Sequence, residues 1–299
     1  MTRLAVEVVA IFGPTGSGKT EVAEQLAGSL GTEVVSADAM QVYRGLPILT
    51  NQPEHPTRLV AIRGLDEEMS VGEYATLAHA EIDDLVARRG SALVAGGTGL
   101  YLRAALADLD VPRRPPPGVR ERWEEAYDRD PARAFAELRS RDTAAATVVH
   151  ANDRRRVVRA LELTDLGGSL APAESRLWTS ETRRPTLVFG LDVSRAVLDE
   201  RIERRTRAMF ERGVVREART ALDAGAASRT AAKTLGLEEI AELPPEEAEA
   251  AIVRRTRRYA SYQRKWMRRI PGIVMIDAER PPAEVAHEIL DGIEDLQPP

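Results

Sequence analysis

One short segment near the N-terminus constrains the fold of this chain more than any other. Residues 13–20 read Gly13-Pro14-Thr15-Gly16-Ser17-Gly18-Lys19-Thr20, which matches the pattern Gly-x-x-x-x-Gly-Lys-Thr. An apolar run from Val6 to Phe12 precedes the segment, and apolar residues at helical spacing follow it over residues 20–30. A buried strand, a glycine-rich loop and a helix, in this order, form the context that a phosphate-binding loop requires.

The chemistry of this loop also suits phosphate. Its glycines allow successive backbone N–H groups to converge on phosphate oxygens at a helix N-terminus. Lys19 is one of only three lysines in an arginine-rich chain, and a compact ammonium grips phosphate differently from a planar guanidinium. We therefore predict that residues 13–20 bind a diphosphate or nucleotide, and that the Thr20 hydroxyl ligates Mg²⁺. The alternative is an ordinary glycine-rich turn.

Composition narrows the class of protein further. A chain of 299 residues with 43% hydrophobic residues can form one large α/β domain with an insertion, or two modest domains. Its apolar runs are shorter than the ~18 residues of a membrane span, and its first residues lack a signal-peptide pattern, so we expect a cytoplasmic protein. The absence of cysteine excludes disulfides, thiolate nucleophiles and cysteine-ligated zinc. A metal must be held by oxygen or imidazole, which fits magnesium with phosphate.

The order of the predicted elements indicates an α/β core interrupted by helices. Strands are predicted at Val6–Phe12, Glu33–Asp38, Ser91–Ala95, Thr186–Leu191 and Ile273–Ile276. Helices are predicted over residues 20–30, 71–88, 195–224, 237–243, 245–269 and 282–295, with another opening at Gly96–Tyr101. The fold class is therefore α/β, a P-loop NTPase-like core with a central parallel sheet flanked by helices, plus a helical insertion domain.

The insertion begins at a proline-rich boundary. Pro112–Gly118 cannot form a helix or a central strand, and residues 119–170 read as wholly helical, with Asn152-Asp153 capping a helix that runs to Leu166. We predict that residues 1–112 form the first part of the core, 113–184 the insertion domain, and 185–299 the second part of the core with the arginine-rich helix 245–269.

Asp38 is a second candidate site residue, because it ends a predicted strand. The carboxyl ends of parallel strands line the ligand crevice, so Asp38 should face the same pocket as the phosphate loop. A carboxylate there can be a helix cap, a residue near magnesium or a general base. Gln41 in the same crevice can present a donor and an acceptor to a nucleobase edge, although it can also be a polar surface residue.

The segment Gly96-Gly97-Thr98-Gly99-Leu100-Tyr101 repeats the arrangement of strand, glycines and helix. Its glycines allow the backbone to approach a ligand, and Thr98 supplies a hydroxyl near a helix N-terminus. Paired glycines in such a turn are also common packing devices, so the segment is a candidate site with a structural alternative.

Positive charge is concentrated in three segments, although the net charge is -5. The first, Ala251–Ile276, holds no acidic residue and interleaves arginines with Tyr259, Tyr262 and Trp266. Such a face suits RNA phosphates and unpaired bases, while a merely solvated face is the alternative.

The second basic segment begins a helix at Asn152–Arg159. Arg155 and Arg159 share one face of this helix, while Val157, Val158 and Leu161 face a core. We expect this segment to contact RNA as well. In the third segment, Arg201–Arg207, an arginine can reach back to the loop-bound phosphates or pair with acidic neighbours on the same helix.

Other phosphate chemistries fit the sequence less well. The guanine-reading Asn-Lys-x-Asp pattern of GTPases is absent, and Asp165–Gly168 matches Asp-x-x-Gly only at the end of an insertion helix. Only the late strand ending at Leu191-Asp192 supplies an aspartate of the kind that motor ATPases need. A transferase with a diphosphate leaving group, or a kinase, remains.

Together these residues resemble one family, the transfer RNA dimethylallyltransferases, which attach an isopentenyl group to the exocyclic amine of the adenosine 3′ to the anticodon. The resemblance covers nearly the whole chain. It rests on the phosphate loop, Ala37–Gly45, Gly96–Tyr101, Val119-Arg120, His150–Leu163, Leu198–Gly213 and Thr256–Arg268.

The resemblance implies a role for each candidate residue. It makes Asp38 the general base on the adenine amine and Thr98 an orienting hydroxyl at the transfer site. It places Lys19, Thr20 and Arg205 on the diphosphate of dimethylallyl diphosphate, with Mg²⁺ as the cofactor. It implies that the anticodon stem-loop of transfer RNA contacts Asp38, Ala39, Met40, Gln41, Thr98, Arg120, Arg155, Arg156, Val157, Val158, Arg159, Lys233, Ser261, Tyr262, Gln263, Arg264, Lys265, Trp266, Met267 and Arg268. We expect a monomer without a membrane partner.

The chain departs from the family pattern at several positions. Members usually carry Gly-Thr-Ala-Lys-Pro where this chain has Leu49-Thr50-Asn51-Gln52-Pro53, a histidine pair near Thr57-Arg58, and a basic pair at Ser261-Tyr262. They also commonly have serine at Ala39, threonine at Lys265 and a lysine near Leu237-Glu238. These departures spare Lys19, Asp38 and Thr98, and we expect them on surfaces that touch RNA.

Three alternative functions share part of this pattern. They are an adenylate dimethylallyltransferase acting on a free nucleotide, a P-loop small-molecule kinase, and a non-catalytic RNA-binding protein. The insertion and the 254–269 helix argue against a free-nucleotide substrate, which needs neither. A non-catalytic protein would keep the arginines without needing Asp38.

Overall fold

The computed structural model describes residues 6–109, 115–171 and 179–295, which form two compact units. Unit 1 comprises 1–109 and 177–299, and unit 2 comprises 110–176. The sequence-based boundaries of the insertion are 113 and 184. Residues 183 and 184 pack on unit 1 instead, since Arg184 forms ion pairs with Glu7 and Asp83, and Arg183 pairs with Asp83.

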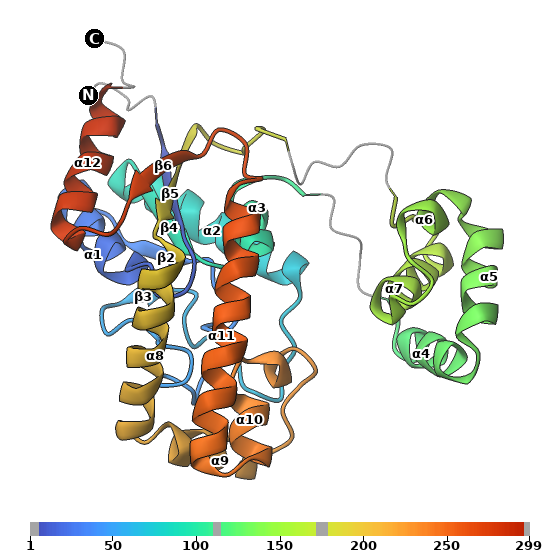
Figure 1. Ribbon diagram of the computed structural model, residues 1–299. Helices are drawn as coiled ribbons and strands as arrows, with labels where there is room; N and C mark the ends of the chain where they lie inside the picture. The colour runs from blue at the N-terminus through green and yellow to red at the C-terminus, as the bar shows by residue number, and fades with distance from the viewer. Residues whose placement is uncertain (1–5, 110–114, 172–178, 296–299) are drawn as a thin grey trace. The chain divides into compact units, whose positions relative to one another are not determined.

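A six-stranded parallel sheet forms the centre of unit 1 (Figure 1). The strands are β1 (Val8–Phe12), β2 (Val34–Ser36), β3 (Thr57–Arg58), β4 (Ala92–Gly96), β5 (Thr186–Asp192) and β6 (Val274–Asp277). Their order is β3-β2-β4-β1-β5-β6, so β1 lies inside the sheet, between β4 and β5. The carboxyl ends of β1, β2 and β4 therefore meet at one edge, which is where the sequence predicts the site. The two-residue strand β3 was not predicted.

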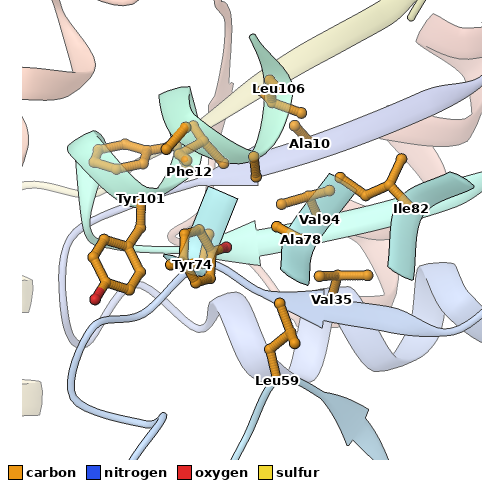
Figure 2. Close-up of a cluster of buried hydrophobic side chains, with 14 of the residues drawn as sticks. Ala10, Phe12, Val35, Leu59, Tyr74, Ala78, Ile82, Val94, Tyr101 and Leu106 are labelled. Atoms are coloured by element: carbon orange, nitrogen blue, oxygen red, sulfur yellow. The ribbon is translucent and has the colours of Figure 1, made fainter. Parts of the chain in front are cut away.

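Helices cover both faces of this sheet, as the α/β prediction requires. On one face lie α1 (Lys19–Leu30) and α12 (Pro282–Asp295), and on the other lie α2 (Val71–Arg89) and α3 (Gly99–Leu106). Figure 2 shows the core between the sheet and the second pair, where Tyr74 and Tyr101 stack at 4.1 Å between ring centroids. This packing fixes the start of α3, and with it the position of Thr98.

The remaining helices of unit 1 form a layer beside the sheet. They are α8 (Arg195–Glu211), α9 (Val214–Asp223), α10 (Leu237–Glu242) and α11 (Pro245–Met267). The predicted helical stretch 195–224 is divided at Gly213, whose φ of 91° is left-handed. Helix α11 packs against α8 and α3, which places the arginine-rich segment beside the phosphate loop and the Thr98 turn (Figure 1).

All the secondary-structure elements in the described part of unit 2 are helices. Its helices are α4 (Val119–Arg129), α5 (Pro131–Arg141), α6 (Thr143–Val148) and α7 (Arg154–Asp165). Asp153 caps α7 by accepting a hydrogen bond from the Arg156 N–H at 3.1 Å, as the sequence predicts. Trp123, Leu138 and Leu161 form part of its separate core.

None of the helices described is both long enough and apolar enough to cross a membrane.

Candidate functional site

The phosphate loop wraps around the Lys19 ammonium. Gly16 and Gly18 adopt left-handed φ angles of 85° and 87°, which a side chain would strain. A Cβ at Gly13 would lie 2.6 Å from Ser17 Oγ, so the turn after β1 also requires glycine. Lys19 Nζ donates a hydrogen bond to the Pro14 carbonyl at 2.8 Å. The loop is therefore closed around its cation.

Helix α8 sends two arginines to this loop. Arg205 donates to Thr15 Oγ1 at 2.6 Å, and Arg201 approaches the Gly16 carbonyl at 3.4 Å. Burial lowers the pKa of Arg205 below its ordinary value, although Asp38 and Glu21 act in the opposite direction. The other two arginines of this segment pair within the helix, Arg204 with Glu200 and Arg207 with Glu203. Arg201 and Arg205 therefore reach back to the phosphate loop. Arg204 and Arg207 instead pair with acidic residues of the same helix, as the alternative interpretation predicts.

Two buried donors at the loop lack a partner among the described residues. They are Ser17 Oγ and Arg205 Nε. Buried polar atoms in native proteins are normally hydrogen-bonded, so unpaired donors beside a glycine-rich loop suit an anionic ligand.

One cavity brings the phosphate loop and the end of β2 together. Its lining includes Lys19, Thr20, Asp38, Gln41 and Gly96. Burial lowers the pKa of Lys19 to about 8, while the Asp38 carboxylate raises it and Arg205 lowers it. Asp38 therefore lies near the cation that ends the loop, in the pocket where its place after a strand predicts it.

The Thr98 hydroxyl joins the turn after β2 to the turn after β4. It accepts a hydrogen bond from the Ala39 N–H at 3.1 Å, and the Met40 N–H donates to Asp38 Oδ1 at 2.9 Å. A Cβ at Gly96 would lie 2.1 Å from the Ala37 carbonyl oxygen, so only glycine permits this approach. The structure thus brings Asp38 and Thr98 together through one hydrogen-bonded pair of turns.

The side chain of Gln41 is held by its neighbours in the same turn. Ser36 Oγ donates to Gln41 Oε1 at 2.9 Å, and Gln41 Nε2 donates to the Asn51 carbonyl at 3.0 Å. Gln52 Nε2 approaches the Gln41 carbonyl at 3.4 Å. Asn51 and Gln52, two of the departures from the family pattern, therefore hydrogen-bond to Gln41, the predicted base-binding residue, and hold it in place. An amide oxygen and an NH₂ group each keep bonding capacity for a ligand.

Helix α11 divides the predicted RNA contacts into buried and exposed residues. Gln263 and Met267 are buried, at 2% and 1% exposure, so their side chains do not form an RNA-facing surface. Trp266 packs on Gly99, where a Cβ would lie 2.2 Å from its ring. Tyr262, at 56% exposure, is available to stack on a base. Among the predicted contacts at its C-terminal end, Lys265 and Arg268 are exposed, while Arg264 pairs with Asp192 at 3.5 Å.

Tyr259 and Ser261 of α11 have different surroundings. The Tyr259 hydroxyl lies 3.4 Å from Thr98 Oγ1, and burial raises the pKa of Tyr259, with Asp38 adding to the shift. Ser261 is exposed and donates to the Arg257 carbonyl at 3.0 Å within the helix. The buried stripe Thr256, Ala260, Gln263 and Met267 has helical spacing, and this was the sequence signal for an inward-facing Gln263.

The predicted contact Lys233 is exposed, at the end of the short 3₁₀ segment Ala231–Lys233.

The predicted RNA contacts of unit 2 are also divided. Val157 and Val158 are buried in the core of this unit, at 0% and 3% exposure, so their inclusion among side chains that touch RNA is corrected. Arg155 and Arg156 are exposed. Arg120 and Arg159 both pair with the buried carboxylate of Glu162. Burial acts to raise the pKa of Glu162, but hydrogen bonds from the two arginines hold it below the ordinary value.

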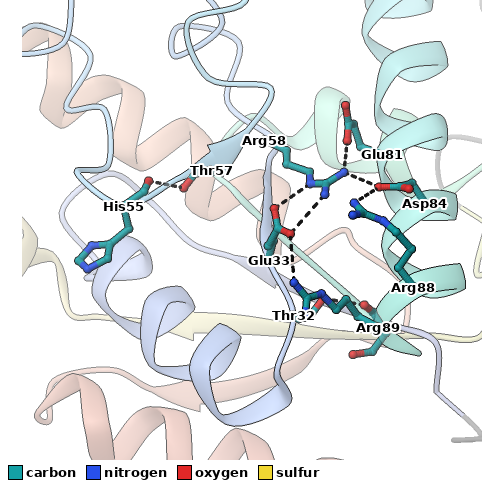
Figure 3. Close-up of polar contacts among 10 residues, drawn as sticks. Thr32, Glu33, His55, Thr57, Arg58, Glu81, Asp84, Arg88 and Arg89 are labelled. Carbon is teal, nitrogen blue, oxygen red and sulfur yellow. Dashed lines mark hydrogen bonds and ion pairs between the residues drawn. The ribbon is translucent and has the colours of Figure 1, made fainter.

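Arg58, expected on an RNA-facing surface, belongs to an ion-pair network. Figure 3 shows its guanidinium between the carboxylates of Glu33, Glu81 and Asp84. The hydrogen bonds that Arg58 donates to Glu33 raise its pKa above the ordinary value despite burial. The network ties the edge strand β3 to α2, so the departure at Arg58 is structural.

The oxygen ligands near the loop fit magnesium. In the described part of the chain, no group of three or more His, Asp or Glu side chains is arranged to hold a metal. The cavity instead offers the Thr20 hydroxyl and the Asp38 carboxylate. Mg²⁺ prefers oxygen and is commonly held by one or two protein ligands together with substrate phosphates and water.

Comparisons with known proteins point to one family. A family profile described as IPP transferase matches residues 41–270, and one described as isopentenyl transferase matches residues 6–63. The tRNA dimethylallyltransferase of Salinispora arenicola is 39% identical over 284 residues, covering 91% of this chain and 82% of that protein.

Two solved structures are similar along nearly the whole chain. The full-length tRNA isopentenylpyrophosphate transferase from Bacillus halodurans has a TM-score of 0.69 at 30% identity, with 97% of each chain covered. A eukaryotic dimethylallyltransferase acting on tRNA has a TM-score of 0.81 at 26% identity, covering 98% of this chain and 80% of that chain. The parallel sheet flanked by helices in this chain, together with its likeness to these structures along nearly the whole chain, confirms the predicted fold class.

Proposed function

The chain belongs to the IPP transferase family, and we propose that it transfers a dimethylallyl group from dimethylallyl diphosphate to the N6 amine of an adenosine in transfer RNA, the one 3′ to the anticodon. The observation that carries this proposal is the cavity lined by Lys19, Thr20 and Asp38, in which the cation and the hydroxyl at the end of the phosphate loop share a lining with a carboxylate. A kinase can also combine a phosphate loop with a carboxylate base, so the relationship to tRNA dimethylallyltransferases is what favours the transferase over a kinase.

The loop side of the cavity binds the leaving group. Backbone N–H groups of the loop, Lys19 and Arg205 hold the diphosphate, and the unpaired Ser17 hydroxyl completes the donor set. These groups stabilise the negative charge that develops on the diphosphate as its bond to the allylic carbon breaks. Thr20 would hold Mg²⁺ together with the bound diphosphate, and the ion would supply further charge neutralisation there.

The carboxylate side of the cavity serves the nucleophile. The adenine N6 attacks the allylic carbon, the carbon–oxygen bond to diphosphate breaks, and the N6 proton moves to the Asp38 carboxylate. Thr98 orients the incoming base, and Gln41 faces its edge. The base must leave its stack to reach a site of this depth.

Each unit has exposed side chains suited to transfer RNA. In unit 1 these are Arg254, Arg258, Tyr262 and Lys265 of α11 and Arg268 at the C-terminal end of that helix, and in unit 2, taken by itself, they are Arg155 and Arg156. A single-stranded loop of RNA suits such a combination of arginine and exposed aromatic residues. We propose the anticodon stem-loop as the bound segment and a cytoplasmic monomer as the active form.

Incubation with labelled dimethylallyl diphosphate and Mg²⁺ tests this function directly. Parallel reactions contain bulk transfer RNA, AMP, or bulk transfer RNA with EDTA. We expect label in transfer RNA alone, lost on chelation, and N6-isopentenyladenosine on nuclease digestion. Label in AMP would identify a free-nucleotide enzyme, and no label in either acceptor would refute the transferase assignment.

A further inference from the structure

Gln263 connects the two loops that form the candidate active site. Its side chain is 2% exposed on the inner face of α11. The Thr15 N–H donates to Gln263 Oε1 at 2.8 Å, and Gln263 Nε2 donates to the Gly97 carbonyl at 2.8 Å. One carboxamide thus spans the phosphate loop and the turn that carries Thr98.

The carboxamide of Gln263 fits at this position because residue 97 is a glycine and has no side chain. A Cβ at Gly97 would lie 2.3 Å from Gln263 Nε2 and 3.2 Å from the Gly13 carbonyl oxygen. The amide is therefore seated where the turns after β1 and β4 approach each other. Few residue types can replace Gln263, because this position requires a hydrogen-bond acceptor and a donor on one planar group at the end of a side chain of this length.

The same helix face also contacts the next residue of the turn. Tyr259 lies one helical turn before Gln263, and its hydroxyl is 3.4 Å from Thr98 Oγ1. Tyr262, adjacent to Gln263 in sequence, points outward at 56% exposure. Helix α11 thus has an outer face suited to RNA and an inner face bonded to both site loops.

We propose that Gln263 is a positioning residue that sets the separation between the diphosphate, held by the phosphate loop, and the adenosine, oriented by Thr98. This inference rests on the proposed transferase function. A distance set by the protein matters because the allylic carbon and the N6 amine must meet in a near-attack arrangement, and a misplacement of about 1 Å can cost on the order of 100-fold in rate. A role in packing alone would change stability without changing the chemical step.

Gln263→Met tests this role, since it keeps the approximate volume but removes both hydrogen bonds. We expect kcat to fall by about 10- to 100-fold, while KM for transfer RNA stays within twofold. Ile252→Val is the matched control, because Ile252 is a buried apolar residue of the same helix packed in a different core cluster. This control should lower the melting temperature but keep kcat. A Gln263→Met enzyme with wild-type kcat and a lowered melting temperature would overturn the proposal.

A double-mutant cycle supplies a second, independent test that does not depend on Gln263→Met folding. Gly97→Ala should lower kcat in the wild-type background, because the new methyl group displaces the amide. In a Gln263→Ala background, the same Gly97→Ala change should have less than about a third of that effect, because no amide remains to be displaced. Equal effects in both backgrounds would show that the two residues act independently, and the proposal would fail. A wild-type enzyme inactive on transfer RNA would instead refute the function itself.

Discussion

The phosphate loop and helix α11 both have distinctive sequences, but they differ in how many of their predicted contact residues are accessible to a ligand. In the loop, Lys19 and Thr20 line the predicted cavity. In α11, Gln263 and Met267 turn inward and Arg264 pairs with Asp192, while Tyr262 and Lys265 stay exposed. The loop conformation is fixed locally by glycines at positive φ. Whether a charged side chain on a helix is ion-paired or exposed depends instead on which residues of other elements lie beside it.

The contrast is strongest among the arginines of α11. Arg255 pairs with Glu238 and Glu239, and Arg257 pairs with Asp199 and Glu203. Each partner comes from another helix. A run of cations in sequence is therefore a mixture of structural ion pairs and exposed charges, and only the exposed ones are candidates for RNA.

The largest effect is expected at Asp38. Asp38→Asn keeps the shape and the hydrogen bond to the Met40 N–H, but it cannot accept the N6 proton. We expect transfer to fall by roughly 10²- to 10⁴-fold, or about 3 to 5 kcal/mol of barrier. Single-turnover transfer at saturating RNA, diphosphate and Mg²⁺ measures this reduction. A rate within about threefold of wild type would exclude a general-base role, since that ratio is below ~1 kcal/mol.

Lys19→Ala comes next in expected size. Removing the cation from the centre of the loop should lower transfer by roughly 10²- to 10³-fold, the usual cost of losing one preorganised stabilising group. The melting temperature at neutral pH should not fall, because Lys19 contacts the loop rather than an apolar core and burial of its charge disfavours the folded state. Arg204→Ala is the matched control, since it removes an exposed cation of α8 that pairs only within that helix among the contacts described. Wild-type turnover in Lys19→Ala at saturating diphosphate would remove the phosphate-loop assignment.

The pH dependence of diphosphate binding gives a smaller effect. The pKa of Lys19 is lowered to about 8, mainly by burial, so the free protein loses this cation as the pH rises through that value. Affinity for dimethylallyl diphosphate should fall above this pKa, by at most about tenfold per pH unit. Titration calorimetry at pH values on both sides of the Lys19 pKa measures the slope. Lys19→Arg should flatten it, and a slope that persists in this variant would assign the titration to another group.

Stability of the ligand-free protein should change in the opposite direction. The folded pKa of about 8 lies below the unfolded value of 10.5, so between them the unfolded chain binds more protons. The contribution of Lys19 to the free energy of unfolding therefore rises as the pH increases from about 8 to 10.5. Chemical denaturation of wild type and Lys19→Met across this range isolates that contribution, which should vanish in the variant.

The smallest effect concerns the exposed face of α11. Charge reversal at Arg254 and Arg258 should weaken transfer RNA binding and reduce the logarithmic salt slope by roughly 0.7 for each RNA phosphate that the helix no longer neutralises. Reversal at Arg255 and Arg257, which are already paired, should lower the melting temperature and leave the salt slope unchanged. Identical salt slopes in the two double variants would show that the exposed arginines are only solvated.

The sequence was sufficient for the local parts of the site and insufficient for its long-range contacts. The strand–loop–helix order predicted the positions of Lys19 and Asp38, because parallel strands bring their carboxyl ends to one edge. The contact of Gln263 with Thr15 spans 248 residues and depends on how α11 packs beside the sheet. Helical spacing of the stripe containing Thr256 and Ala260 indicated an inward face, but the density of arginines around it favoured an RNA surface instead.

The Thr98 hydroxyl has only one hydrogen to give, and the fold determines where that hydrogen can go. Because the Ala39 N–H already donates to this oxygen, the remaining possibilities are the Tyr259 hydroxyl or a bound ligand. Either hydroxyl can be the donor in the contact between Thr98 and Tyr259. If Tyr259 donates, the threonine hydrogen is left for a ligand that presents an acceptor, such as a ring nitrogen of adenine. If Thr98 donates to Tyr259 instead, its second lone pair is left for a ligand that presents a donor, so the tyrosine decides which edge of a base Thr98 can meet.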